Sequence, residues 1–440
     1  MPGEATPATP SDPIYLGIDL GTSGCRIAAI DGREKLLATA DTAIPTPQRQ
    51  GRKISQDPML WWQAVQTCLN AICRDIDPGR VAALAVDGTS ATLLLCDQNG
   101  VPLTEALMYN DSRAQAQAQR VAEAAPPDAG CFGASSSLSK LLWFQDQGLP
   151  NSTRHALHQS DWIAGKLGGQ WGHSDYNNCL KLGYDVHALA WPGWLKKLKV
   201  PETLLPTVHA PGNTVGHITE AVSSRWGFPR ETRVVAGTSD GVAAFLAAGV
   251  SEPGQGVTSL GSTLVIKLLS HVPVSSPAHG IYSHRLGNQW LAGGASNSGG
   301  AVLLQHFTTE QLQAMTPQLD PEHLLNLNYY PLPGTGERFP VNDPNRTAQL
   351  EPRPNNDVQF FQAMLEGMGH IEARGYQLLH ELGAPKVKEI KTTGGGSHNP
   401  AWTKIRECII GVPITPPASA MAAYGAALLA SGVVQRAFGG

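Results

Sequence analysis

One short pattern occurs in each half of this 440-residue chain, and it constrains the fold more than any other feature. An apolar strand ends in a Leu-Gly-hydroxyl turn, and a second apolar strand follows. The first copy includes Gly17–Ser23 and the second includes Val257–Thr263. A strand, a tight turn and a returning strand are typical of a hairpin. Two such hairpins, one in each half, predict a duplicated architecture with two lobes.

Signals for strands and helices alternate along the rest of the chain, which favours an α/β fold. Apolar residues make up 42% of the sequence and charged residues 15%, with 47 glycines and 33 prolines. This composition favours a loop-rich enzyme over a coiled coil or a disordered chain. We expect a helix to begin at Asp57-Pro58, because Asp is a good N-cap and Pro a good first helical residue. Further helices are expected at Asp357–Leu382 and Pro400–Ile410.

Composition also argues against several classes of protein and partner. The net charge is −4 and no run of Lys or Arg occurs, so nucleic acid is a poor candidate partner. The longest strongly apolar stretch, Ala420–Ala430, is too short to span a bilayer. The seven cysteines are scattered without a Cys-x-x-Cys pair, which fits reduced thiols in the cytoplasm. Residues 1–13 lack the basic and apolar regions of a signal peptide, and we expect a disordered leader.

The first hairpin has the residue types of a phosphate and metal site. Gly21 and Gly24 form a turn whose backbone N–H groups can approach a polyphosphate closely, and Thr22 and Ser23 add hydroxyl donors. Asp19 lies at the end of the first strand, where its carboxylate can hold Mg²⁺ directly or through water. The alternative is an ordinary hairpin with an incidental Asp. The chain has no G-x-x-x-x-G-K-[ST] sequence, which excludes a P-loop.

A second carboxylate follows the strand expected at Arg233–Ala236. Asp240 lies in the segment Gly237–Gly241, at the turn between that strand and a helix. Ligands of open α/β folds bind at the carboxyl ends of the strands, so this position favours a catalytic role. Asp240 also fits the N-cap of the following helix. The pattern by itself leaves both interpretations open.

Two further segments have residue patterns that suit a ligand. The triple glycine Gly394–Gly396 lies between a strand and a helix, and it leaves no side chains to obstruct a flat ligand such as adenine. A strained loop that requires positive φ is the alternative. In the other segment, Asp111 and Arg113 are separated by one residue at the entry to a helix, and both can hydrogen-bond a polyol. On pattern alone, a capped helix start with a surface ion pair is the better interpretation there.

Taken together, these segments resemble the FGGY family of carbohydrate kinases, in family order over nearly the whole chain. The matching segments are Gly17–Ser23, Asn110–Arg113, Ser160–Ile163, Gly237–Gly241, Ser259–Thr263, Gly394–Asn399 and Ala423–Ala430. The resemblance implies a two-domain actin-like ATPase (ribonuclease H-like) fold with a cleft between the lobes. We expect an N-terminal domain at 14–232 and a C-terminal domain at 233–440.

The resemblance also implies roles for the matching residues. Asp240 would be the general base on the sugar hydroxyl, and Asp19 would be the carboxylate associated with Mg²⁺. The implied cofactors are therefore ATP and Mg²⁺, and the implied partners are a small sugar and ATP. Residues implied to contact the substrate are Asp19, Ser23, Thr89, Ser90, Asp111, Arg113 and Asp240. Residues implied to contact ATP are Gly21, Thr22, Ser23, Gly261, Ser262, Thr263, Gly394, Gly395, Gly396 and Asn399.

Departures from the family pattern bear on the substrate. Xylulokinase-like members usually carry Gln-Met-His-Gly after the strand that ends here at Asp87, whereas this chain has Gly-Thr-Ser-Ala-Thr at Gly88–Thr92. The Gln-Arg-Glu-Thr pattern of glycerol kinases is absent, and Tyr109 replaces the usual Trp of the sugar loop. The chain is also shorter than typical members. These features resemble the short cyanobacterial and plant kinases that act on D-ribulose, which would place Thr89 and Ser90 near the sugar.

The implied function is ATP-dependent phosphorylation of a ketopentose at a terminal hydroxyl, with D-ribulose to D-ribulose 5-phosphate as the first choice. D-xylulose is the next candidate, followed by glycerol or another polyol. Two alternatives come from other classes: an actin-like ATPase that needs no sugar, and a non-catalytic protein that binds a sugar or a nucleotide. The presence of both Asp19 and Asp240 argues against the non-catalytic alternative. The sequence leaves the oligomeric state, monomer or homodimer, open.

Overall fold

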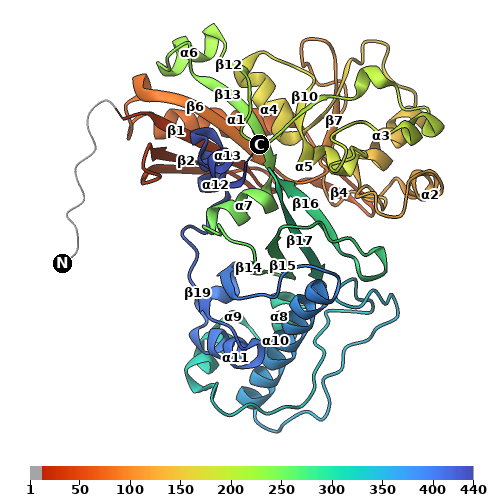
Figure 1. Cartoon of the computed structure of the whole chain (residues 1–440), viewed down its shortest axis with the longest axis vertical. Helices are drawn as coiled ribbons and strands as arrows, with labels where there is room; N and C mark the ends of the chain where they lie inside the picture. Colours follow the sequence, from red (N-terminus) through yellow and green to blue (C-terminus); the bar gives the residue numbers. More distant parts are fainter. Residues whose placement is uncertain (1–11, 440) are drawn as a thin grey trace. The chain divides into compact units, whose positions relative to one another are not determined.

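The chain forms two units in the computed structural model, which describes residues 12–439 (Figure 1). The first unit runs to Ala247 and also includes the chain from Met421 onwards, and the second is the chain between them. This division differs from the predicted boundary between residues 232 and 233. The physical reason is that β13 (Arg233–Ser239) pairs with β6 (Val81–Gly88) in the first unit. Of the expected leader at 1–13, residues 1–11 lie outside the described residues.

The first hairpin lies at the centre of a six-stranded sheet in the first unit, with strand order β12-β13-β6-β1-β2-β3. β1 (Ile14–Leu20) is antiparallel to β2 (Gly24–Asp31) and parallel to β6, and β13 is parallel to β6 on its other side. The edge strands are β3 (Leu36–Ala43) and β12 (Thr214–His217). The apolar runs of β1 and β6 are almost wholly buried, as expected of parallel strands that are covered on both faces.

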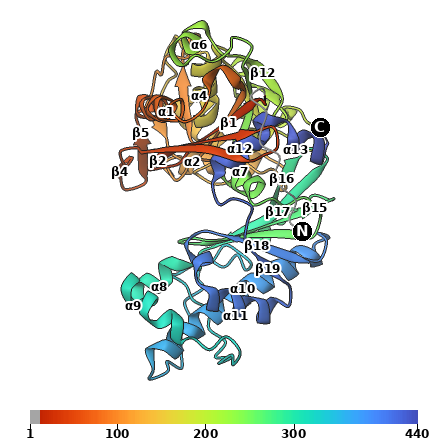
Figure 2. The same ribbon diagram turned by 90° about the vertical axis from the view of Figure 1, so that its left-hand side faces the viewer.

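Helices cover both faces of this sheet (Figure 2). α1 (Pro58–Ile72) and α4 (Gln159–Gly168) lie on one face, where Trp61 and Trp162 pack edge to face in the core. The Asp57 side chain caps α1 by accepting a hydrogen bond from the Met59 N–H, as predicted. α7 (Asp240–Ala247) and α12 (Ala422–Ser431) lie on the other face.

The helix α12 packs directly against the backbone of β1, although the two elements are about 400 residues apart in the sequence. A Cβ atom added at Gly17 would lie 1.9 Å from the carbonyl oxygen of Ala423. A Cβ atom added at Gly425 would lie 1.9 Å from the carbonyl oxygen of Ala243 in α7. Both positions therefore require glycine, because no side chain fits between the paired backbones.

The first unit also contains a smaller layer of strands and helices, most of which lie between β6 and β13 in the sequence, whereas β4 and β5 precede β6. Its sheet has the order β4-β5-β8-β7-β9, and β10 pairs with β11 separately. The region from Ser112 to Gly183 is largely helical as predicted, but it also contains β9 and β10. The bounds are β4 (Gln48–Gln50), β5 (Lys53–Gln56), β7 (Leu93–Cys96), β8 (Ala106–Leu107), β9 (His155–His158), β10 (His173–Asp175), β11 (Thr207–His209), α2 (Gln115–Ala124), α3 (Ser137–Asp146), α5 (Tyr176–Cys179) and α6 (Glu220–Trp226).

The second unit repeats the central arrangement of the first. β14 (Gln255–Leu260) is antiparallel to β15 (Leu264–Ser270) across the second hairpin and parallel to β18 (Glu389–Thr393). The sheet order is β16-β17-β15-β14-β18-β19, with the long helix α10 (Asp357–Glu381) packed against it (Figure 2). The remaining bounds are β16 (Tyr282–Leu286), β17 (Gln289–Ser296), β19 (Ile414–Thr415), α8 (Gly300–His306), α9 (Thr309–Met315) and α11 (Pro400–Ile410), with α13 (Val433–Phe438) in the first unit.

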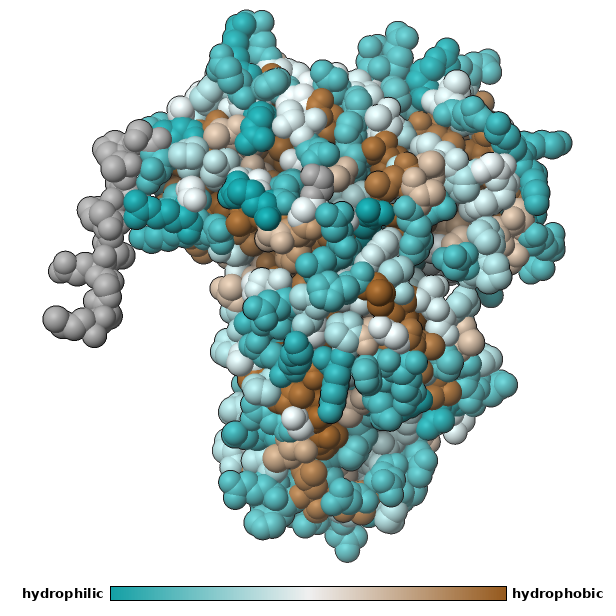
Figure 3. Space-filling model, viewed as in Figure 1, coloured by the Kyte–Doolittle hydropathy of each residue, from teal (hydrophilic) through white to brown (hydrophobic). Residues whose placement is uncertain are grey.

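Hydrophilic side chains cover most of the face drawn in Figure 3, with hydrophobic residues visible between them. The most exposed large hydrophobic residues are Leu304 in α8 and Val101 in a loop of the first unit. Over the described part of the chain, no helix combines the length and the hydropathy needed to cross a membrane.

Candidate active site

Three carboxyl groups meet at the carboxyl edge of the parallel strands in the first unit. Asp19 is the penultimate residue of β1, and it lies opposite Asp87, the penultimate residue of β6. Asp87 in turn lies opposite Thr238 in β13, two residues before Asp240 at the start of α7. The structure therefore brings together Asp19 and Asp240, which the sequence singled out, and adds Asp87, which it did not.

Asp87 is completely buried, unlike Asp240. If Asp87 and Asp19 are both ionised, neither carboxyl oxygen of Asp87 has a hydrogen-bond partner. Burial raises the pKa of Asp87 well above its usual range, and the charges of Asp19 and Asp240 raise it further. Burial also raises the pKa of Asp19, while hydrogen bonds from Asp87 and Arg26 oppose that shift. A proton on Asp87, donated in a hydrogen bond to Asp19, accounts for the raised pKa of Asp87 and gives its carboxyl group a partner.

Asp240 is partly exposed, in contrast to Asp87. It is the first residue of α7, and its Oδ1 accepts a hydrogen bond of 2.6 Å from the Gly241 N–H. Asp240 therefore lies at the junction between β13 and α7. This position lies in the first turn of α7, where an acidic side chain is favourable, and the catalytic role stays a prediction.

The turn of the first hairpin is closed by a 2.9 Å hydrogen bond from the Gly21 N–H to the Gly24 carbonyl oxygen. Thr22 is half-buried and Ser23 is exposed, so the hydroxyl of Ser23 lies at the surface of the unit. The Ser23 carbonyl oxygen accepts a hydrogen bond from the Ile44 N–H, which ties the turn to the end of β3. The turn is thus anchored through its backbone while its two hydroxyl side chains remain on the accessible side.

The segment Gly88–Thr92 follows Asp87 and is held by Gln159 from α4. The Gln159 Oε1 atom accepts hydrogen bonds from the Thr89 N–H at 3.0 Å and from the Thr89 hydroxyl at 2.7 Å. The Ser90 hydroxyl and the Gln159 Nε2 group are buried without a hydrogen-bond partner. Buried polar groups are nearly always paired in folded proteins, so these two atoms point to a ligand or to ordered water.

The predicted sugar loop places Asp111 and Arg113 side by side. The Asp111 carboxylate is fully buried, and it accepts hydrogen bonds from the Ile54 N–H, the Arg113 N–H and the Arg113 side chain. Asp111 is therefore already engaged by protein donors, and its evident role is to orient Arg113. The Arg113 guanidinium lies 4.9 Å from the ring centre of Trp143 on α3. This is a buried ion pair, in contrast to the surface pair that the pattern alone favoured.

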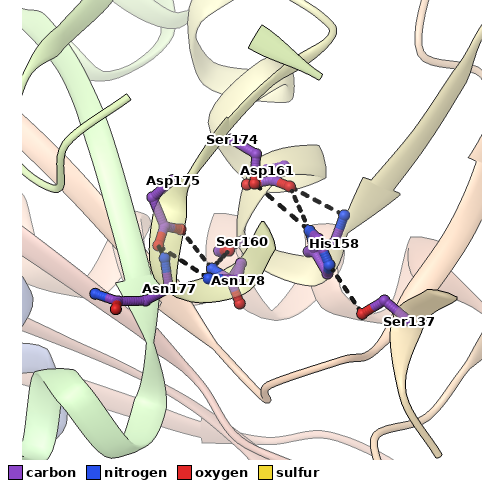
Figure 4. Close-up of polar contacts among 8 residues, drawn as sticks. All are labelled: Ser137, His158, Ser160, Asp161, Ser174, Asp175, Asn177 and Asn178. Atoms are coloured by element: carbon purple, nitrogen blue, oxygen red, sulfur yellow. Dashed lines mark hydrogen bonds and ion pairs between the residues drawn. The ribbon is translucent and has the colours of Figure 1, made fainter. Parts of the chain in front are cut away.

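A buried polar network supports the strand that leads to Asp240 (Figure 4). Asp175, at the end of β10, accepts hydrogen bonds from the N–H groups of Asn177 and Asn178 and from the Asn178 Nδ2 group. The Asn177 Nδ2 group donates to the Thr238 hydroxyl in β13 at 3.1 Å. The Asn178 Nδ2 group also donates to the Ser160 hydroxyl of α4. The network thus connects α4, α5 and β13 immediately before Asp240.

In the second unit, the turn at 261–263 and the triple glycine lie next to each other. β14 and β18 are parallel with Ser259 opposite Thr393, so both segments leave the same edge of the sheet. Gly394 has a φ of +83°, and a Cβ atom there would lie 2.7 Å from the Leu260 carbonyl oxygen. A Cβ atom at Gly396 would lie 2.4 Å from the Trp402 ring. Packing within the second unit therefore accounts for glycine at both of these positions.

The remaining residues predicted to contact ATP in this unit differ in their surroundings. A Cβ atom at Gly395 would meet no atom within 4 Å, so packing within the unit does not require a glycine at this position. The Asn399 side chain caps α11 by accepting a hydrogen bond from the Trp402 N–H, and it also donates to the Thr316 hydroxyl. Gly261 and Ser262 are exposed, whereas Thr263 is half-buried.

The donor set at the carboxyl edge suits Mg²⁺ held mainly by a substrate. No group of three or more His, Cys, Asp or Glu side chains within residues 12–439 is arranged to hold a metal ion by itself. Mg²⁺ usually binds through one or two carboxylates together with waters and substrate phosphates. A single carboxylate at Asp19, beside the glycine-rich turn, fits that mode.

Sequence reasoning missed Asp87, Gln159 and Lys140 in this unit. Asp87 had a usable signal, because it follows an apolar strand and precedes a glycine-hydroxyl turn, as Asp19 does. Gln159 and Lys140 have no such signal, since a long polar side chain next to a helix pattern is normally exposed. Both are fully buried in the structure.

Solved structures of several sugar kinases share this fold. A xylulose kinase of Lactobacillus acidophilus superimposes with a TM-score of 0.85 at 20% identity, covering 96% of this chain and 89% of that chain. A gluconate kinase of the same organism also gives 0.85 at 20% identity, covering 98% and 90%. A glycerol kinase of Plasmodium falciparum gives 0.82 at 15% identity, covering 97% and 90%. The predicted two-domain actin-like ATPase fold is thereby confirmed.

Curated relatives align over most of the chain. A xylulose kinase of Escherichia coli (strain K12) is 25% identical over 421 residues, covering 90% of this chain and 85% of the relative. A xylulose kinase of Streptomyces coelicolor is 26% identical over 447 residues, covering 96% and 88%.

The family comparison matches both units. Residues 14–247 match the N-terminal domain of the FGGY family of carbohydrate kinases, and residues 256–432 match its C-terminal domain. The first match ends at the same residue as the first continuous part of the first unit. The resemblance drawn from the seven sequence segments is confirmed, and the chain belongs to the FGGY family of carbohydrate kinases.

Proposed function

We propose that this kinase transfers the γ-phosphoryl group of ATP to a terminal hydroxyl of a ketopentose, and that D-ribulose is the preferred sugar. The observation that carries the choice of sugar is the segment Gly88–Thr92, which stands where xylulokinase-like members carry Gln-Met-His-Gly. The Ser90 hydroxyl in this segment is buried without a hydrogen-bond partner. A sugar hydroxyl at this place would supply the missing partner.

In this proposal the chemistry in the first unit is divided between two carboxylates. Asp240, which is partly exposed at a rigid junction, accepts the proton of the sugar hydroxyl as it attacks phosphorus. Asp19 holds Mg²⁺, which offsets the negative charge of the phosphates. The transition state of phosphoryl transfer is loose, so positioning and charge neutralisation provide most of the acceleration. A protonated Asp87 beside Asp19 leaves one negative charge on the pair instead of two.

We further propose that the second unit binds the nucleotide at the edge where β14 and β18 end. Gly395 has open space around its Cβ position, which lets a flat base approach the backbone. The exposed hydroxyl of Ser262, in the adjacent turn, is available to phosphate oxygens. Because Asn399 caps α11, we expect it to shape the loop more than to contact the nucleoside directly.

D-xylulose is the second candidate substrate, and a specific finding favours it. The curated relatives described above are xylulose kinases at 25% and 26% identity. At this identity the sugar site can differ while the fold is retained. The replacement of Gln-Met-His-Gly by Gly-Thr-Ser-Ala-Thr is such a difference, and it is the reason for placing D-ribulose first.

A coupled ADP-release assay tests the proposal with D-ribulose, D-xylulose, L-ribulose, glycerol and no sugar. We expect D-ribulose to give the highest kcat/KM, at least about tenfold above D-xylulose, which corresponds to about 1.4 kcal/mol in the transition state. A higher kcat/KM for D-xylulose would overturn the choice of sugar while leaving ketopentose kinase activity in place. ADP release that no sugar stimulates would instead indicate an ATPase and overturn the proposed reaction.

A further inference from the structure

Lys140 is a completely buried lysine in α3, one of the largest side chains with no exposed surface. Its Nζ atom donates hydrogen bonds to the carbonyl oxygens of Ala91 at 2.8 Å and Met108 at 2.7 Å. Lysine is almost never fully buried without a specific partner. Here the partners are backbone carbonyls in two segments that are far apart from α3 in the sequence.

One of these carbonyls lies in the segment that the proposed function assigns to the sugar, and the other lies next to the sugar loop that the family resemblance implies. Ala91 lies in Gly88–Thr92, directly after Ser90. Met108 immediately precedes the loop that contains Arg113, and its carbonyl oxygen also accepts the Asp111 N–H at 2.9 Å. One ammonium or amine group therefore connects the two segments at a single point.

The segment Gly88–Thr92 requires such a tether because its backbone is strained. Ala91 has a φ of +69°, a left-handed conformation that a residue with a side chain rarely adopts. Gln159 holds the start of the segment through Thr89, and Lys140 holds its end through the Ala91 carbonyl. Without the second contact, the strained turn at Ala91 is free to relax and to move Ser90.

The helix α3 is itself fixed relative to both segments. The Ser137 hydroxyl, at its first residue, lies 3.0 Å from the Nε2 atom of His158, and the other ring nitrogen of His158 lies 3.0 Å from Asp161 (Figure 4). His158 is the residue before Gln159, which holds Thr89. One turn after Lys140, Trp143 of the same helix lies under Arg113. The helix thus reaches both segments from a fixed base.

The Lys140 amine can hold both carbonyl oxygens in either of its protonation states. Burial lowers the pKa of Lys140 to about 7, with the positive charge of Arg113 contributing and the carboxylate of Asp111 opposing the shift. A neutral amine has two N–H groups and a charged one has three. Either form supplies donors for the two carbonyl oxygens, so both hydrogen bonds persist on either side of this pKa.

We propose that Lys140 is a positioning residue for the sugar: its hydrogen bonds to the Ala91 and Met108 carbonyls hold Ser90 and Arg113 at a fixed separation. The inference rests on the proposed function, which places Ser90 at the sugar, and on the family resemblance, which implies a sugar contact for Arg113. Loss of the tether disturbs the sugar contacts, whereas neither hydrogen bond reaches the turn at Gly21–Gly24.

The test compares Lys140→Met with Leu69→Ala in the full-length protein. A methionine side chain is close to lysine in length and removes the donors. Leu69→Ala creates a cavity at α1 in the core of the same unit, outside both segments in the sequence, and serves as the control for general destabilisation. We expect K140M to raise the KM for the ketopentose about tenfold, with the KM for ATP changed less than about twofold. L69A should lower the melting temperature while leaving both KM values near those of the wild type.

Hydrogen exchange of the wild type and of both variants separates the tether from the reaction. In K140M, amides at 88–92 and 109–113 should exchange at least about tenfold faster, whereas L69A should leave these two segments unchanged. A folded K140M with wild-type KM values and wild-type exchange would overturn the inference. Equal rises in both KM values would also overturn it, because that result indicates general damage. If the wild type shows no sugar-dependent turnover, the proposed function fails. The exchange comparison still tests the tether in that case: faster exchange of the two segments in K140M supports it, and unchanged exchange contradicts it.

Discussion

At the carboxyl edge of the first sheet, Asp87 and Asp240 have opposite surroundings. Asp87 is completely buried between two other acidic groups, and a proton gives it the partner that it otherwise lacks. Asp240 is partly exposed and is fixed by the start of α7. Burial disfavours the charged form of Asp87, whereas Asp240 is partly exposed, so the two carboxyl groups suit different roles.

The first prediction concerns Asp240. Replacement of Asp240 by Ala should lower kcat by about 10²–10⁴-fold, because the sugar hydroxyl loses its general base. The KM for ATP should stay near that of the wild type. Steady-state kinetics of D240A and the near-isosteric D240N check this expectation, and both should lose activity to a similar degree. Turnover close to the wild type in either variant would remove Asp240 from the mechanism.

Candidate site residues can be chosen from the sequence where the local pattern carries a signal. Asp19 and Asp240 could be identified because each follows an apolar strand and borders a glycine-hydroxyl turn. Lys140 could not, because its burial depends on two segments that approach α3 only in the folded chain. Asp111 was identified as a sugar contact, but the sequence could not reveal that the Ile54 N–H and Arg113 already engage its carboxylate.

At the scale of single elements, the short helix α5 depends on the buried carboxylate of Asp175. Burial raises the pKa of Asp175 from its ordinary value of 3.8 to about 7, and the charge of Asp161 adds to the shift. Between these values the folded state binds more protons than the unfolded state. The contribution of Asp175 to stability is therefore lost as the pH rises from about 4 to about 7.

The second prediction follows from this loss of stability with rising pH. Asp175→Asn should make the loss of stability between pH 5 and pH 8 shallower, by up to about 3 kcal/mol. The neighbouring Asn178 has a buried Oδ1 atom without a partner, and this atom can accept a hydrogen bond from the new amide. Melting temperatures of both proteins across this pH range provide the measurement. Parallel curves for wild type and variant would contradict the raised pKa.

The third prediction concerns the contact between β1 and α12. Gly17→Ala places a methyl group within 1.9 Å of the Ala423 carbonyl oxygen, so the helix must move. We expect a loss of about 3 kcal/mol or more, since overpacking between backbones cannot be relieved by side-chain rotation. Gly193→Ala is the matched control, because a Cβ atom there meets no atom within 4 Å. Urea denaturation should show a large loss for G17A and almost none for G193A; similar midpoints would refute the close packing.

Elements were predictable where their ends are marked locally, and less so where pairing is long-range. The helix Pro400–Ile410 was placed correctly at both ends, since Asn399 caps its start and Gly411 ends it in a left-handed conformation. The strand β7 follows β6 in the sequence but belongs to a different sheet, where it pairs with β9. No local pattern distinguishes these two sheets, because the choice depends on a partner about sixty residues away.

At the scale of the whole molecule, the two units differ in how the chain builds them. The second unit is one continuous segment, Ala248–Ala420, whereas the first needs both ends of the chain. This division differs from the predicted boundary at 232/233 for two reasons: β13 pairs with β6 in the first unit, and α12 packs against β1.

The fourth prediction is that truncation after Ala420 affects the two units differently. Removal of α12 and α13 exposes the face of β1 and β6 that α12 covers, so the first unit should lose its cooperative structure. The second unit retains its own core around α10 and β15 and should keep protected amides. Hydrogen exchange followed by mass spectrometry resolves the two regions. Full protection of β1 and β6 in the truncated chain would contradict this division.

The position of α12 also has a consequence for synthesis on the ribosome. Translation proceeds from the N-terminus, and the nascent chain can begin to fold as it emerges. Residues 248–420 leave the exit tunnel before the helix that completes the first sheet. The second unit can therefore fold before the first is complete. Until the last residues are translated, the face of the first sheet that α12 covers stays exposed.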